Sequence, residues 1–326
     1  MRLLTRRSLL YTEMVTVGAI LHGDREHHLR FEAIEQPLAL QLGGNDPTAL
    51  ARCARIAERY GYDEVNLNCG CPSNKVQQGQ FGACLMKQPQ LVAQCIAAMR
   101  DAVSIPVTIK HRIGIDRETS YDRLATFVGS VADAGCHTFI VHARAAWLDG
   151  ISPKQNRTLP PLDYNLVYRL KADFPEREFI LNGGINSLVE AKQHLSQVDG
   201  VMLGREAYSN PYILAEVDQM IHGEPTSSIE RLTVLEQLIP YAEIELRNGV
   251  RLHQIARHIL GLFHGQPGAR RFRQLLSTRA GLAEADTSLL CEALALMNEL
   301  SHFRSDNGAA SLADASPPGN APDRST

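Results

Sequence analysis

The sequence predicts an α/β protein: a TIM (β/α)8-type barrel followed by a C-terminal all-α helical bundle. Short apolar runs rich in β-branched residues recur about every 25–40 residues, and amphipathic helical stretches lie between most of them. After about residue 224 the pattern becomes purely helical. The 326 residues, 44% of them hydrophobic, suffice for one large domain and one small one.

Seven strands are predicted before about residue 207, at 9–16, 37–44, 64–70, 106–114, 138–144, 179–184 and 200–205. Helices are predicted between them, such as 46–61, where Asp46 suits the N-cap and Pro47 the first helical position. A closed barrel has eight strands, whereas an open doubly wound sheet can have six or seven.

Polar residues or glycines stand at or just past the carboxyl ends of nearly all these strands: Gln41, Asn68, Lys110, His142, Asn182 and Gly204. A barrel gathers all strand ends around one pocket, whereas an open sheet spreads them along a line. The distribution therefore favours a barrel with its functional site at the carboxyl-terminal face.

The C-terminal third predicts helices at 228–249, 251–268, 269–281 and 285–303, separated by Gly or Gly-Pro. The remaining segment is rich in Ser, Ala, Pro and Gly, which is typical of a disordered tail. We therefore expect a barrel domain over residues 1–222, a helical domain over 223–303 and a tail over 304–326.

The composition of the chain argues against a membrane protein, a secreted protein and a uniformly basic nucleic-acid-binding protein. A net charge of −3 gives the whole chain no preference for nucleic acid, so any basic surface must be local. No apolar run approaches the roughly 18 residues of a membrane span, and the N-terminus lacks the apolar core of a signal peptide. The seven cysteines are expected to be reduced thiols of a cytoplasmic protein.

The segment "NCGCPS" holds two cysteines that are one residue apart. This spacing suits neither a zinc site nor a Cys-x-x-Cys redox pair, and a buried thiol is most often an apolar filler. Strand alternation puts Cys69 on the face of Leu67, whereas Cys71 falls in the loop beyond the strand. Cys71 is therefore the candidate for chemistry, and Cys84 and Cys95, on helical stretches, are expected in the core.

The segments "LNGGI" (181–185) and "LGREAYSNP" (203–211) follow the last two strands. Glycines there let backbone N–H groups approach an anion, and Arg205 adds a charged fork. No dinucleotide fingerprint follows an early strand, so a mononucleotide such as FMN is favoured, with Lys110 and His142 facing an anionic ring. The alternative is that the glycines only form tight turns and the two basic residues are ordinary solvated groups.

A local basic segment lies in the helical part. Between Arg247 and Ala283 there is no Asp or Glu, but there are seven arginines and three histidines. Such segregation predicts a phosphate-binding surface of the kind that nucleic acids need. The alternative is a solvated helical face without a partner.

Several motifs together resemble the tRNA-dihydrouridine synthases. They are "NLNCGCPS", "GQFGACLM", "PVTIKHRIG", "IVHAR", "LNGGI" and "DGVMLGREAYSNP". The segments "LLYTEMVTVGAI", "WLDGISPKQNRTLPPLDY" and "LGLFHGQPGARRFRQLLS" resemble the A subfamily. The resemblance covers residues 2 to 300 and implies an FMN-bearing barrel followed by a helical tRNA-binding domain.

The resemblance also implies roles for individual residues. Cys71 matches the catalytic acid, and Cys69 stands at a variable position. The flavin contacts are matched by Gln41, Lys110, His142, Asn182, Gly183, Gly184, Gly204 and Arg205. Positions near the tRNA are matched by Asn68, Lys154 and Arg157, and positions that choose the target uridine by Arg270 and Arg273. No metal is implied.

The implied reaction reduces the C5–C6 double bond of uridines 20 and 20a in the tRNA D-loop. NADPH, or NADH, reduces FMN, flavin N5 gives hydride to C6, and Cys71 protonates C5. Family members begin with a strand that carries an Ala-Pro-Met segment. We expect that this strand either precedes the printed sequence or has been lost by truncation, which leaves a seven-stranded barrel with an open seam. A monomer is expected.

Two alternatives remain open from the sequence. One is a flavin barrel that acts on a free pyrimidine, as dihydroorotate and dihydropyrimidine dehydrogenases do. The other is a truncated, non-catalytic tRNA-binding protein.

Overall fold

The computed structural model describes residues 1–225 and 228–312, with side chains as far as residue 300. It divides into two compact units. The described residues of the first unit are 1–207 and 216–225, and those of the second are 208–215 and 228–312.

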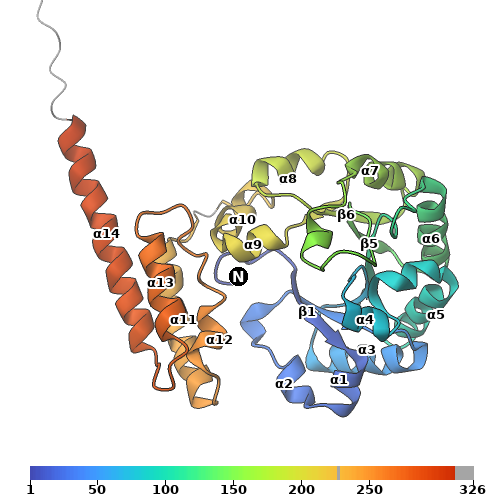
Figure 1. The fold of residues 1–326 in the computed structure, drawn as a ribbon, viewed down its shortest axis with the longest axis horizontal. Coiled ribbons are helices and arrows are strands. Elements are labelled where there is room, and N and C mark those ends of the chain that lie inside the picture. The colour runs from blue at the N-terminus through green and yellow to red at the C-terminus, as the bar shows by residue number, and fades with distance from the viewer. Residues whose placement is uncertain (226–227, 313–326) are drawn as a thin grey trace, which may run out of the picture. The chain divides into compact units, whose positions relative to one another are not determined.

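The first unit is built on one sheet of seven parallel strands whose spatial order equals their chain order (Figure 1). The strands are β1 (Leu10–Thr16), β2 (Leu38–Gly43), β3 (Glu64–Cys69), β4 (Val107–Arg112), β5 (Thr138–His142), β6 (Glu178–Asn182) and β7 (Gly200–Met202). All seven predicted strands are confirmed. Sequential parallel order with helices outside is the arrangement of a (β/α) barrel, and within the described residues β1 and β7 form its two edges.

Helices surround the sheet, and Figure 1 shows α3, α5, α6, α7 and α8 in turn along its outer side. They are α1 (Val17–His22), α2 (Arg25–Leu29), α3 (Pro47–Tyr60), α4 (Asn74–Gln78), α5 (Pro89–Arg100), α6 (Tyr121–Asp133), α7 (Tyr164–Asp173), α8 (Leu188–His194), α9 (Arg205–Ser209) and α10 (Val217–Met220). Short 3₁₀ helices are η1 (Ala33–Glu35), η2 (Gly82–Lys87), η3 (Gln155–Arg157) and η4 (Pro211–Glu216).

Local sequence explains where α3 begins and which face it buries. The side chain of Asp46 accepts the N–H of Ala49, and Pro47 occupies the first turn, where no helical donor is lost. Leu50, Cys53 and Ala57 then recur at helical spacing and are fully buried against the sheet. Helix and strand thus bury their apolar sides together, which leaves the strand ends free to carry polar groups.

The second unit is helical: α11 (Arg231–Arg247), α12 (Leu252–Ala256), α13 (Ala269–Arg279) and α14 (Ser288–Leu312). The helix predicted over 251–268 is shorter than expected, because α12 ends at Ala256 and turns follow up to Gly268. Helix α14 is longer than expected and continues past residue 304, where a tail was predicted. The rest of that tail, 313–326, lies outside the described residues.

None of the described helices is both long enough and apolar enough to cross a bilayer.

Candidate active site

The strand register brings the predicted polar residues into rows at the carboxyl ends of the strands. Gln41 stands opposite Asn66, and Asn68 opposite Lys110. His142 in turn stands opposite Asn182. Paired residues of neighbouring parallel strands point to the same side of the sheet, so these side chains share the inner side of the barrel.

The loop that carries Cys71 is held by four hydrogen bonds, from Asn68, Arg112 and Ala83. The Oδ1 of Asn68 accepts the backbone N–H of Gly70 at 3.1 Å and that of Cys71 at 3.0 Å. Arg112 Nε donates to the carbonyl of Gly70 at 3.0 Å, and the N–H of Ala83 donates to the carbonyl of Cys71 at 2.9 Å. The half-buried Cys71 therefore has a fixed backbone.

The other thiols have different surroundings. Cys69 is fully buried in the hydrophobic core, and this burial raises its pKa well above the usual value. Cys95 is buried as predicted. Cys84 is only half-buried, because it lies on the short η2 rather than inside a long helix, and its Sγ donates to the carbonyl of Phe81 at 3.1 Å.

Three basic side chains, Lys110, Arg112 and His142, lie on neighbouring strands near the loop that carries Cys71. Burial, together with nearby Arg112, lowers the pKa of Lys110 to about 8. Burial and the charges of Lys110 and Arg112 lower the pKa of His142 to about 2, so this imidazole is neutral at physiological pH. Within the described residues, Lys110 and Arg112 form no ion pair: Lys110 Nζ donates to Asn182 Oδ1 at 3.0 Å, and Arg112 binds backbone carbonyls. Such a cluster is suited to an anionic ligand.

Two glycines continue this cluster at the end of β6. Gly183 has φ +117° and Gly184 has φ +78°. A Cβ on Gly183 would meet His142 Cδ2 at 2.6 Å, and one on Gly184 would meet Leu162 Cδ1 at 2.6 Å. Only glycine fits here, and the backbone stays close to the imidazole. The Tyr164 hydroxyl fixes the turn by donating to the Gly183 carbonyl at 2.7 Å.

Three further predicted residues line one cavity of about 670 Å³, together with Ser152, Gln155 and Thr158. They are Lys154, Arg157 and Arg205, all of them exposed. Arg205 Nη2 donates to the Arg157 carbonyl at 3.0 Å, so the loop after β7 is tied to the loop after β5. Gly204 is exposed, and a Cβ there would meet nothing within 4 Å.

The last two predicted residues belong to the second unit. Arg270 and Arg273 lie on the exposed side of α13, whose buried side is formed by Ala269, Phe272 and Leu276. Gly268 is the N-cap of this helix, and the first turn carries no acidic residue.

Sequence reasoning missed Arg112 and the buried polar residues below the site. Arg112 is 4% exposed and donates to the carbonyls of Gly70, Ala145 and Asn156. Its position two residues after Lys110 on the same strand was an available signal, because alternation puts both on one face. Glu64 and Thr108 gave no such signal, since their pairing depends on the register between β3 and β4.

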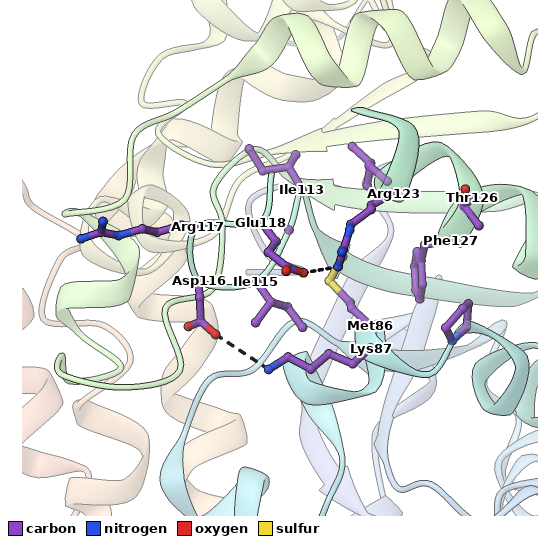
Figure 2. Close-up of a pocket in the computed structure, with 13 residues that line it drawn as sticks. Met86, Lys87, Ile113, Ile115, Asp116, Arg117, Glu118, Arg123, Thr126 and Phe127 are labelled. Atoms are coloured by element: carbon purple, nitrogen blue, oxygen red, sulfur yellow. Dashed lines mark hydrogen bonds and ion pairs between the residues drawn. The ribbon is translucent and has the colours of Figure 1, made fainter. Parts of the chain in front are cut away.

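A separate cavity of about 900 Å³ lies beside the loop after β4, and none of the predicted site residues line it. Figure 2 shows two ion pairs among its lining residues, with Ile115 between them and Arg117 pointing away from both. Lys87 pairs with Asp116 at 3.8 Å, and Arg123 pairs with Glu118. Four of its five charged residues are thus paired, unlike Lys110. Among the described residues, no group of three or more Cys, His, Asp or Glu is placed to hold a metal.

The fold and the site together define a barrel enzyme whose strands carry basic side chains at their carboxyl ends, next to a loop with a half-buried thiol. The chain matches the family Dihydrouridine synthase (Dus) over residues 1–298, and it belongs to this family.

Individual relatives are similar over nearly their whole length. The tRNA-dihydrouridine(20/20a) synthase of Pseudomonas syringae pv. tomato is 59% identical over 293 residues, which is 90% of this chain and 87% of that protein. The protein of the same name from Synechocystis is 57% identical over 90% of this chain and 88% of its own length. The one from Escherichia coli K12 is 57% identical over 91% and 86%.

Proposed function

We propose that this protein reduces the C5–C6 double bond of uridine to 5,6-dihydrouridine in tRNA, at positions 20 and 20a of the D-loop. The observation that carries the proposal is the fixed Cys71 loop next to a basic cluster. The relatives named above are all tRNA-dihydrouridine(20/20a) synthases, which supports the same substrate.

FMN is the cofactor that fits the residues of the site. Its phosphate suits the positive-φ Gly183 and Gly184 with Arg205, and its ring suits the buried Lys110 beside the neutral His142. Gln41 and Asn182 offer amide groups for the polar edge of the ring, and Gly204 leaves open space at the phosphate end. Bound FMN supplies hydride chemistry, accepting hydride from NADPH and passing it to C6 of uracil.

Cys71 is the general acid in this proposal. The C4 carbonyl of uracil polarises the double bond, so that negative charge develops at C5 when C6 receives hydride. The Cys71 thiol holds a proton for C5, and its fixed backbone keeps the sulfur in one place relative to the base. Lys110, whose pKa of about 8 leaves it charged at neutral pH, stabilises anionic charge below the base.

The tRNA contacts are assigned to two sets of residues. Asn68, Lys154 and Arg157 lie at the barrel's carboxyl-terminal face, where an extruded base enters. Arg270 and Arg273 present charge on α13 for the phosphate backbone and for selection of the target uridine.

The deciding experiment measures NADPH oxidation by the purified protein with three substrates: unmodified tRNA, free uridine and uracil. We expect a bound flavin spectrum, oxidation only with tRNA, and dihydrouridine at positions 20 and 20a in the recovered RNA. Equal turnover of free uridine would favour a small-molecule reductase. A colourless protein that binds tRNA without turnover would refute the catalytic assignment.

A further inference from the structure

Below the site, five polar side chains form one continuous series of hydrogen bonds through the interior of the barrel. This polar chain consists of Glu64, Thr108, Asn66, Gln41 and Asn68. We propose that the polar chain, from Glu64 to Asn68, positions the loop that carries Cys71. The catalytic consequence rests on the function proposed above, whereas the positioning itself does not.

Each link is short and well formed. Asn68 Nδ2 donates to Gln41 Oε1 at 2.7 Å, and Gln41 Nε2 donates to Asn66 Oδ1 at 2.9 Å. Asn66 Nδ2 donates to Thr108 Oγ1 at 2.8 Å. The Thr108 hydroxyl then donates to Glu64 Oε1 at 2.6 Å. Every donor therefore points toward Glu64.

This direction is fixed at both ends. At the loop end, Asn68 Oδ1 accepts two backbone N–H groups, which can only donate, so its amide nitrogen must face Gln41. At the other end, Glu64 Oε1 is an acceptor and receives the hydroxyls of Thr108 and Tyr11. The Thr108 hydroxyl oxygen must then accept a hydrogen bond from Asn66. This fixes the orientation of the side-chain amides of Asn66 and Gln41, which lie between the two ends.

Glu64 keeps this acceptor role in either protonation state. Burial raises the pKa of its carboxyl group, but a proton on Oε2 would leave Oε1 free to accept both hydroxyls. The direction of the polar chain therefore depends on the carbonyl-like oxygen rather than on the charge.

Burial makes the polar chain intolerant of a broken link. The exposed fractions are 0% for Asn66, 2% for Thr108, 7% for Glu64 and 8% for Asn68. Gln41 is half-buried, and a buried donor left without an acceptor carries the full free-energy penalty of its desolvation. The side-chain amide that carries this donor would rotate to find another acceptor. The next amide of the polar chain would then lose its own hydrogen-bond partner.

The last member of the polar chain connects this interior to the chemistry. Asn68 holds the Gly70 and Cys71 amides only while Gln41 holds its Nδ2. A turned Asn68 would point an NH₂ group at two N–H groups, and the loop would keep only its bonds to Arg112 and Ala83. Thr108 and Glu64 are thus positioning residues for Cys71, although neither contacts it.

The test compares Thr108→Val with Thr108→Ser and Tyr11→Phe. Val keeps the shape of Thr and removes the hydroxyl from the polar chain, whereas Ser restores it. Tyr11→Phe is the matched control, because it removes a hydroxyl from the same Glu64 oxygen without breaking the chain. Hydrogen exchange of the Gly70 and Cys71 amides, and alkylation of Cys71 relative to Cys84, are measured without flavin, NADPH or tRNA.

In Thr108→Val we expect the Gly70 and Cys71 amides to exchange several-fold faster, up to about tenfold. The rate of Cys71 alkylation should rise, whereas the rate of Cys84 alkylation should stay constant. With tRNA, kcat should fall more than KM changes, and Thr108→Ser should recover both readouts. Equal exchange in Thr108→Val and Tyr11→Phe, or no recovery in Thr108→Ser, would overturn the proposal.

A second pair breaks the polar chain at its far end. Glu64→Met removes the acceptor, whereas Glu64→Gln keeps a carbonyl oxygen, so the first should loosen the loop and the second should not. This pair decides the question if Thr108→Val does not fold. A wild type that never reduces uridine, combined with a loop that loosens in Thr108→Val, would refute the proposed function and leave the positioning role intact.

Discussion

The Nζ of Lys110 donates a hydrogen bond to Oδ1 of Asn182 at 3.0 Å, so a buried ammonium is paired with a neutral amide and not with a carboxylate. Burial lowers the pKa of this lysine to about 8. The site therefore holds a positive charge at a cost in stability, which an anionic ligand would offset.

Lys110→Met should stabilise the ligand-free protein. Because the pKa of Lys110 is about 8 in the folded protein and the ordinary value of a lysine is 10.5, the unfolded state binds more protons between these pH values. The unfavourable contribution of Lys110 to wild-type stability is therefore fully present below about pH 8. It decreases as the pH rises from about 8 to 10.5, so the protein becomes more stable over this range. In urea unfolding, the free energy of unfolding of Lys110→Met should exceed that of wild type at pH 7.5, and the difference should be smaller at pH 9.5.

The control for this variant is Lys171→Met. Lys171 Nζ pairs with Asp199 at 2.8 Å, so its removal should destabilise the protein instead. With flavin present, Lys110→Met should also retain less FMN than wild type. A Lys110→Met protein that is less stable than wild type at pH 7.5 would contradict the unpaired charge.

Cys71→Ala should lower uridine reduction by about 10² to 10⁴-fold, the usual contribution of a general acid. Flavin content and the single-turnover reduction of the bound flavin by NADPH should be unchanged, because the thiol is needed only for C5. Cys84→Ala is the matched control, since Cys84 is also half-buried but lies on η2. The assignment fails if Cys71→Ala turns over normally while Cys69→Ala does not.

The strands and the burial of Cys69 could be predicted because both follow from local sequence. Short apolar runs rich in β-branched residues predicted all seven strands, and side-chain alternation along a strand put Cys69 in the core and Cys71 in the loop. The helix over 251–268 was overextended because apolar spacing continues through residues that form turns, among which Gly261 and Gly265 weaken helix formation.

The rest of the site depends on contacts between distant segments. Thr108 and Glu64 are 44 residues apart in sequence and meet through the register of neighbouring strands. Arg112 reaches the Asn156 carbonyl in a loop after the next strand. Periodicity gives the face of a side chain but not its partner across strands, so the polar chain could not be predicted from the sequence.

Gly183→Ala should destabilise the protein, whereas Gly204→Ala should leave the stability of the ligand-free protein unchanged. Gly183 has φ +117°, and a Cβ there would meet the His142 ring at 2.6 Å, so both backbone strain and a clash follow. The expected loss is about 1–3 kcal/mol of stability, together with weaker FMN binding. Gly204 has open space around the position of its Cβ. Thermal unfolding and flavin content of the two variants check this, and equal behaviour would argue against a tight cradle at Gly183.

Arg270→Ala and Arg273→Ala should weaken tRNA binding without loss of flavin. Both side chains are exposed on α13, and each phosphate contact that is lost should reduce the slope of log K against log salt by about 1. Arg279→Ala is the control on the same helix, because Arg279 already pairs with Glu292 at 2.7 Å and has less charge to offer. Binding is measured by titration at several salt concentrations, and the modified position by sequencing the product. If both variants keep the wild-type salt slope and modify the same uridines, α13 does not contact the tRNA through these residues.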